Sequence, residues 1–163
     1  MNRNHAIGRP HFVLAVLLGF CVSFAQAQFQ PSSAIQSAIS IPLDRLLQPQ
    51  QLNEILQKKT HPLPLVLQVG SHMLFSEAHI PGSEFAGPGS QPFGLEMLRN
   101  RVASLPKDKF IVIYCGCCPW ERCPNLGPAY QQLRDLGFTN VKVLYIANNF
   151  GADWAAKGYG VEK

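Results

Sequence analysis

The sequence has no strong excess of charge of either sign. Its 163 residues include 14 Lys and Arg and 10 Asp and Glu, and the net charge is only +4. A small, scattered charge argues against a nucleic-acid partner, because proteins that bind nucleic acids carry clustered basic residues. Charged residues make up 15% of the chain and hydrophobic ones 47%, which excludes wholesale disorder. No internal repeat is visible, and the length suits one domain with its own core.

A long apolar run occurs only near the N-terminus, at residues 12–24. Arg3 and Arg9 precede this run, no acid accompanies them, and Ala25 and Ala27 follow it. This order is typical of a secretory signal, so we expect residues 1–27 to be cleaved off and the protein to be periplasmic or secreted. The alternative is a membrane anchor, for which the run is barely long enough. After cleavage the net charge would fall to +2, and we expect no stable membrane association.

The rest of the chain alternates between two kinds of apolar pattern. Continuous apolar runs predict buried strands, whereas helical spacing of Leu, Ile, Tyr and Val predicts helices. This alternation predicts an α/β fold with a parallel sheet and helices on both faces. We expect an exposed lead-in at 28–48, a folded domain at 49–163 and a loop at 75–92. The predicted strands lie within 63–70, 109–114 and 140–146, and the predicted helices within 49–59, 93–105 and 125–138.

Four cysteines follow the second predicted strand: Cys115, Cys117, Cys118 and Cys123. Ligands of parallel sheets bind beyond the carboxyl ends of the strands. A loop that turns there into a helix can direct backbone N–H groups at an anion, which also favours a thiolate over a thiol. Position therefore makes Cys115 a candidate nucleophile.

The additional cysteines allow three interpretations. Export favours structural disulfides. Alternatively, Cys117, Cys118 or Cys123 could act as a resolving thiol that attacks a persulfide or mixed disulfide on Cys115. All four thiols could instead bind zinc or a soft copper ion, although their spacing is not a standard zinc-knuckle pattern and no second pair follows.

Several short motifs together resemble a single rhodanese domain, from about Pro49 to Lys163. They are Phe75 before the "HIPGS" of His79–Ser83, "YC" at Tyr114–Cys115, "LGFTNVKVL" at Leu136–Leu144, and Trp154. The resemblance implies a sulfurtransferase in which a cysteine accepts a sulfane sulfur and passes it to a thiol or a cyanide-like acceptor. It also implies a cradle of backbone N–H groups around the persulfide and no metal or organic cofactor.

Within this resemblance Cys115 takes the place of the catalytic cysteine. We expect Gly116, Cys117, Cys118, Trp120 and Arg122 to bind the substrate, with Arg122 attracting an anionic donor. Arg122 lies five positions after Cys117, which would suit Cys117 as nucleophile, whereas Tyr114 at the strand end favours Cys115. Gln68 and Gly70 stand where the family has an acidic and a basic residue.

Other functions remain possible from the sequence. The "CGCC" motif favours a thioredoxin-like redox protein, but too little chain follows it for that fold. A cysteine phosphatase needs C-x5-R, whereas Cys115 and Arg122 are spaced as C-x6-R. A non-catalytic module with a metal- or disulfide-bound cluster is a further alternative. We expect His79 to stabilise a turn, Trp154 to lie in the core, and Trp120 to be either a lid or a packing residue.

Overall fold

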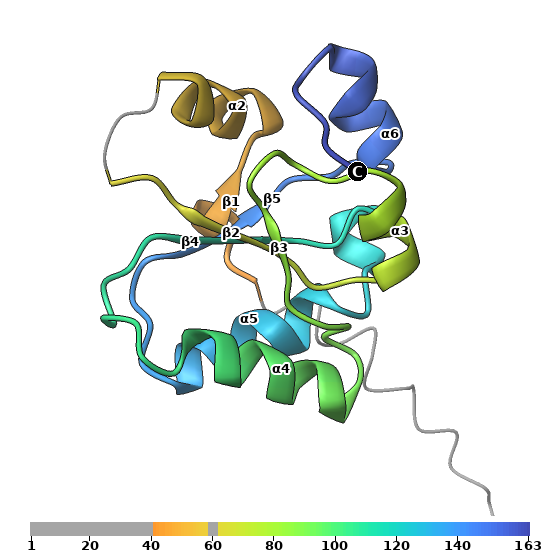
Figure 1. The fold of residues 1–163 in the computed structure, drawn as a ribbon. Coiled ribbons are helices and arrows are strands. Elements are labelled where there is room, and N and C mark those ends of the chain that lie inside the picture. Colours follow the sequence, from red (N-terminus) through yellow and green to blue (C-terminus); the bar gives the residue numbers. More distant parts are fainter. Residues whose placement is uncertain (1–40, 59–61) are drawn as a thin grey trace, which may run out of the picture. The chain divides into compact units, whose positions relative to one another are not determined.

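The computed structural model describes residues 41–58 and 62–163, so the predicted signal segment and most of the predicted lead-in lie outside it. Five parallel strands form one sheet in the order β1-β5-β4-β2-β3 (Figure 1). The predicted parallel sheet is therefore confirmed. The strands are β1 (Leu46–Leu47), β2 (Leu65–Gln68), β3 (Glu84–Phe85), β4 (Ile111–Tyr114) and β5 (Val141–Leu144).

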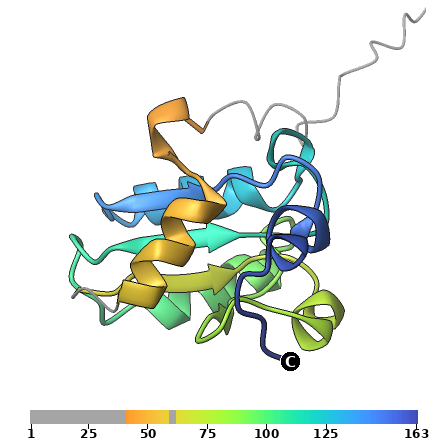
Figure 2. The same ribbon diagram turned by 90° about the horizontal axis from the view of Figure 1, so that it is seen from above.

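Helices cover both faces of the sheet, as the α/β prediction requires. Figure 2 shows α2 and α6 in front of the strands and α4 and α5 behind them. In the described residues, no helix is long and apolar enough to span a membrane. The helices are α2 (Pro49–Lys58), α3 (His72–Glu77), α4 (Pro92–Val102), α5 (Leu126–Asp135) and α6 (Phe150–Asp153), with 3-10 turns η1 (Leu43–Arg45), η2 (Trp120–Arg122) and η3 (Ala155–Lys157).

Alternation along each strand divides the core into two clusters. In β4, Ile111 and Ile113 pack with residues of α4 and α5, while Val112 and Tyr114 pack with residues of α2 and α6. Because successive side chains of a strand point to opposite faces, a strand covered on both faces must be apolar throughout. All four residues of β4 are buried, which explains its unbroken apolar run.

Several short elements lie where the sequence indicated none, among them α6, α3, β3 and β1. The short helix α3 and the two-residue strand β3 lie in or beside the predicted loop, and β1 lies in the predicted lead-in. Ile41 is also buried in the core, so the folded part begins before Pro49. Two-residue strands are too short to show a period of two, and the positions of β1 and β3 depend on pairing with β5 and β2.

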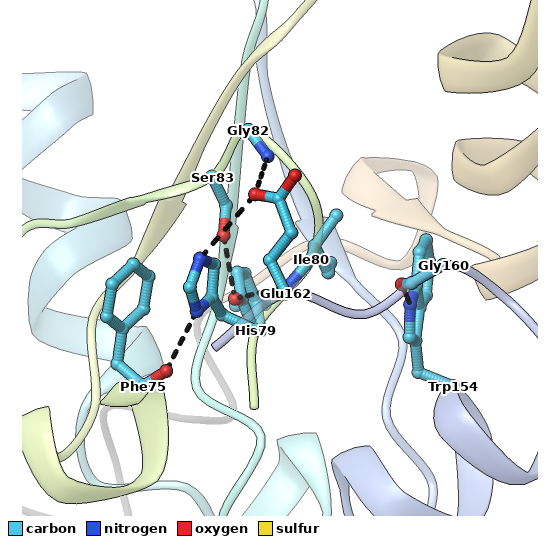
Figure 3. Close-up of polar contacts among 9 residues, drawn as sticks. Phe75, His79, Ile80, Gly82, Ser83, Trp154, Gly160 and Glu162 are labelled. Carbon is cyan, nitrogen blue, oxygen red and sulfur yellow. Dashed lines mark hydrogen bonds and ion pairs between the residues drawn. The ribbon is translucent and has the colours of Figure 1, made fainter. Parts of the chain in front are cut away.

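The C-terminal segment returns to the turn at His79, as Figure 3 shows. The backbones of His79 and Glu162 exchange two hydrogen bonds of 2.9 and 3.0 Å. The His79 ring stacks on Phe75, and its Nδ1 lies 2.9 Å from the carbonyl oxygen of Phe75. Trp154 is 1% exposed and donates from Nε1 to the carbonyl oxygen of Gly160. The structural roles predicted for His79 and Trp154 are confirmed.

Candidate active site

The register between β2 and β4 brings two chain segments together at the carboxyl end of the sheet. Gln68 pairs with Tyr114, so the residues that follow each strand are neighbours. The Gln68 side chain fixes this junction, since its Nε2 donates to the carbonyl oxygen of Cys115 (3.1 Å) and its Oε1 accepts from the N–H of Gly70 (3.1 Å). A Cβ at Gly70 would lie 2.8 Å from Cys115 Sγ. Any larger residue at this position would collide with the sulfur, so the close approach requires glycine.

A glycine also redirects the chain directly after Cys115. Gly116 has φ +83°, a conformation that costs side-chain-bearing residues free energy. Its carbonyl oxygen accepts from the N–H of Phe150 (2.9 Å), and a Cβ at this position would lie 3.1 Å from Phe150 Cβ. The loop after β4 is thereby bound to the start of α6.

A cavity of about 370 Å³ opens between this loop, α3 and α6. Cys115 lies at its wall although the residue is only 2% exposed, and the exposed Cys117 lines it too. Glu77 is the one acidic or basic residue among the described residues that line it. The cavity is lined by Gln68, Leu74, Glu77, Ala78, Tyr114, Cys115, Gly116, Cys117, Asn149, Phe150, Gly151 and Ala155.

The cysteine sulfurs form a compact cluster of free thiols. Cys115 Sγ lies 3.1 Å from Cys117 Sγ, which in turn lies 2.9 Å from Cys118 Sγ. The sulfurs of Cys115, Cys117 and Cys123 all lie within 4.8 Å of one another. These three thiols could hold a soft metal ion. The four-thiol set considered from the sequence is thus reduced to three, because Cys118 is not part of it.

Hydrogen bonding concentrates the negative charge of this cluster on Cys115. The thiols of Cys117 and Cys123 donate to it and hold its pKa well below the ordinary value, against the opposing effect of burial. The backbone N–H of Cys117 and the side chain of Asn125, whose Nδ2 lies 3.3 Å from Sγ, act in the same direction. The pKa values of Cys117 and Cys123 are raised, chiefly because of their hydrogen bonds to Cys115. The lowered pKa favours the thiolate form at Cys115 over the thiolate forms of its neighbours.

The structure separates the residues that the sequence grouped as substrate-binding. Gly116 and Cys117 line the cavity, whereas Cys118, Trp120 and Arg122 are not among its lining residues. Trp120 is 6% exposed and packs in the core, so it is a packing residue and not a lid. Its N–H donates to the carbonyl oxygen of Ile146 (2.8 Å) and does not contribute to an anion cradle. Arg122 is exposed on η2.

Asn125 was not predicted from the sequence, although its side chain contacts the reactive sulfur. It lies ten residues after Cys115, just before α5, and is 8% exposed. Its Oδ1 accepts from the N–H of Ser90 (3.0 Å), which orients the amide so that Nδ2 faces Cys115. An Asn at a helix start ordinarily indicates a cap. Here no cap hydrogen bond forms, and the side chain bonds to other parts of the fold.

The chain belongs to the family of rhodanese-like domains. The family model "Rhodanese-like domain" matches residues 48–145, more than half of the 163 residues. This confirms the resemblance inferred from the sequence motifs. Among the curated proteins, none matches the chain.

Solved structures show the same fold at low sequence identity. A rhodanese-like domain from Anabaena is 23% identical, with TM-score 0.53, covering 72% of this chain and 78% of its own. The single-domain sulfurtransferase RDL2 from Saccharomyces cerevisiae is 16% identical, with TM-score 0.52 and coverages of 70% and 90%. A protein of unknown function from Rhodopseudomonas palustris, described as a possible tyrosine phosphatase, is 17% identical, with TM-score 0.56 and coverages of 80% and 92%. At these identities the likeness establishes the fold alone.

Proposed function

We propose that the protein is a sulfurtransferase that carries a sulfane sulfur as a persulfide on Cys115. One observation supports this most strongly: Cys115 at the carboxyl end of β4 lies in the wall of a cavity, and hydrogen bonds to its sulfur lower its pKa and favour the thiolate. A thiolate is the reactive form of cysteine, and preoriented donors stabilise sulfur anions without a metal.

The reaction would take place in two displacements at sulfur. In the first, Cys115 Sγ attacks the sulfane sulfur of a donor, a new S–S bond forms, and the remainder of the donor departs with the bonding electron pair. In the second, an acceptor nucleophile attacks the outer sulfur and Cys115 leaves as a thiolate. The donors that stabilise the thiolate, namely Asn125 Nδ2 and the Cys117 N–H, favour its departure in the second step.

A phosphatase function is not supported by this site. Such an enzyme needs a cation beside the thiolate to bind the phosphate dianion. Arg122, the arginine at C-x6-R spacing, is exposed and is not among the residues that line the cavity.

Sulfur transfer to cyanide tests the proposal. The reduced protein is incubated with thiosulfate or inorganic polysulfide, and the thiocyanate formed with cyanide is measured. We expect wild type to form thiocyanate with at least one donor and Cys115→Ser to form none above the uncatalysed rate. Circular dichroism of Cys115→Ser establishes that the variant is folded. Undiminished activity of Cys115→Ser, or activity lost only in Cys117→Ser, would show that Cys115 is not the nucleophile.

Export is a separate part of the proposal and rests on the order of residues 1–27. Expression of the full chain in a Gram-negative host, followed by intact mass measurement of the periplasmic fraction, should give a chain that begins at Gln28. Protein found only in the cytoplasm with Met1 retained would exclude the signal.

A further inference from the structure

We infer that Cys117 resolves the persulfide by attacking Cys115 Sγ, which releases the sulfane sulfur as hydrosulfide and leaves a Cys115–Cys117 disulfide. This inference rests on the proposed function, because it begins from a persulfide on Cys115. It assigns the protein a reductive role: the sulfane sulfur of the donor is reduced to sulfide, and two cysteines are oxidised.

The distance between the two sulfurs supports this assignment. Cys117 Sγ lies 3.1 Å from Cys115 Sγ, which is the inner sulfur of the proposed persulfide. Attack there forms the Cys115–Cys117 bond, whereas sulfur transfer to Cys117 would require attack on the outer atom. The reversal of the chain at Gly116, with φ +83°, brings two residues so close in sequence face to face. The resolving thiol is therefore already positioned before sulfur is bound.

The space around Cys115 suits the departure of the outer sulfur. Displacement at sulfur is in line, so the outer atom must leave on the side opposite Cys117 Sγ. Both cysteines line the same cavity, and a side chain at Gly70 would collide with Cys115 Sγ. This cavity is therefore the route by which the leaving sulfur would depart.

The other two thiols of the cluster are less suited to this role. Cys123 is 1% exposed and does not line the cavity, so a disulfide through it would be closed to an external reductant. Cys118 contacts Cys117 Sγ at 2.9 Å and also does not line the cavity. Cys117 alone combines exposure, cavity lining and contact with Cys115 Sγ among the described cysteines.

The step balances in atoms and charge. The persulfide anion Cys115–S–S⁻ and the thiol of Cys117 give the disulfide and HS⁻, and the proton of Cys117 passes to the leaving sulfur. The disulfide then needs two electrons before another turnover, and an external dithiol of small-molecule or protein origin supplies them by exchange at the exposed Cys117. The cycle therefore consumes one dithiol for each hydrosulfide released.

Trapping experiments under anaerobic conditions test the inference. Reduced full-length protein is treated with inorganic polysulfide, quenched with iodoacetamide at successive times and measured by intact mass and peptide mapping. We expect wild type to pass from a persulfide to a Cys115–Cys117 disulfide, with two fewer thiols alkylated. Cys117→Ser should retain the added sulfur on Cys115. Cys118→Ser should form the same disulfide as wild type, and Cys115→Ser should form neither persulfide nor disulfide.

The outcomes separate this inference from the proposed function. If wild type keeps its persulfide as long as Cys117→Ser does, or if the disulfide joins Cys115 to Cys123, the resolving role of Cys117 is wrong while sulfur transfer stands. If Cys117→Ser acquires no sulfur, the proposed function fails and the inference fails with it. A persulfide on Cys117 in Cys115→Ser would reverse the two roles.

Discussion

At the scale of single residues, the site depends on which of three neighbouring thiols is ionised. Cys115 accepts hydrogen bonds from Cys117, Cys123 and Asn125. Among these three residues, Asn125 alone is not a cysteine. The backbone N–H of Ser90 orients the Asn125 side chain, so the position of this amide does not depend on the thiols. Asn125 is therefore the residue through which the charge of Cys115 can be changed without altering a sulfur.

We predict that Asn125→Asp slows alkylation of Cys115 at mildly acid pH. The carboxylate keeps an oxygen for Ser90 but replaces a donor to the thiolate with a negative charge, which raises the Cys115 pKa. In wild type the pKa is lowered, so the rate with iodoacetamide should change little between about pH 8 and about pH 5. In Asn125→Asp the rate should fall over this range. Peptide mass spectrometry gives the rate at Cys115 specifically.

The exposed Asn100→Asp on α4 is the matched control and should follow the wild-type profile. Identical pH profiles of the alkylation rate for Asn125→Asp and wild type would show that Asn125 does not affect the thiolate.

The lowered pKa of Cys115 also has a consequence for stability. The thiolate stabilises the folded state above the ordinary thiol pKa, and this contribution is lost as the pH falls toward the lower folded-state value.

At the scale of elements, the sequence predicted long and strongly patterned segments and missed short ones. Strands β2, β4 and β5 lie inside the predicted apolar runs, and α2, α4 and α5 lie inside or within one residue of the predicted helices. The missed α3 has only six residues and no buried one, so it shows no apolar face. Elements of this size depend on tertiary contacts more than on local sequence pattern.

The same distinction applies to the candidate site. Cys115 could be placed at a strand end because an apolar run leads into it and strand ends of parallel sheets carry sites. The contacts of Gln68 and Asn125 with Cys115 join segments 47 and 10 residues apart, which no local pattern reports. Trp120 and Arg122 were assigned to the site from their place in the cysteine loop and from the resemblance to rhodanese. Their short turn η2 directs Trp120 into the core and leaves Arg122 in solvent.

The helix α3 brings a negative charge to the cavity, which should affect the choice of donor. Glu77 lies at the end of α3 and is exposed at the cavity, where it repels anions. We predict that Glu77→Gln accelerates sulfur transfer from thiosulfate about two- to fivefold, as expected for about 0.5–1 kcal/mol of screened repulsion. Transfer from an uncharged organic trisulfide should stay unchanged. Thiocyanate formation measures both rates.

The acceleration that Glu77→Gln gives with thiosulfate should shrink with added salt, because exposed charges are screened. Glu96→Gln on α4 is a control of the same charge change away from the cavity, and it should leave both rates unaltered. Equal acceleration with the two donors would contradict an electrostatic origin.

At the scale of the whole molecule, the hydroxyl of Tyr114 connects the central strand to the turn that the C-terminal segment also contacts. It accepts from the N–H of Ile80 (3.2 Å) and lies 3.0 Å from Ser83 Oγ. Burial raises the Tyr114 pKa to about 12 against the weaker opposing effect of these hydrogen bonds. The sheet and the turn before β3 are thereby joined through one buried polar group.

We predict that Tyr114→Phe lowers the free energy of unfolding by about 1–3 kcal/mol, because the buried N–H of Ile80 loses its partner. Urea denaturation at neutral pH measures this loss. Tyr159→Phe keeps the ring contact with Trp154 and should cost much less. Wild type should also lose stability as the pH rises from about 10 toward about 12, because the unfolded tyrosine ionises first. Tyr114→Phe should lack that part of the alkaline loss of stability, since it has no hydroxyl to ionise. If the free energy of unfolding of Tyr114→Phe falls with alkaline pH as it does in wild type, the buried hydroxyl does not couple proton binding to folding.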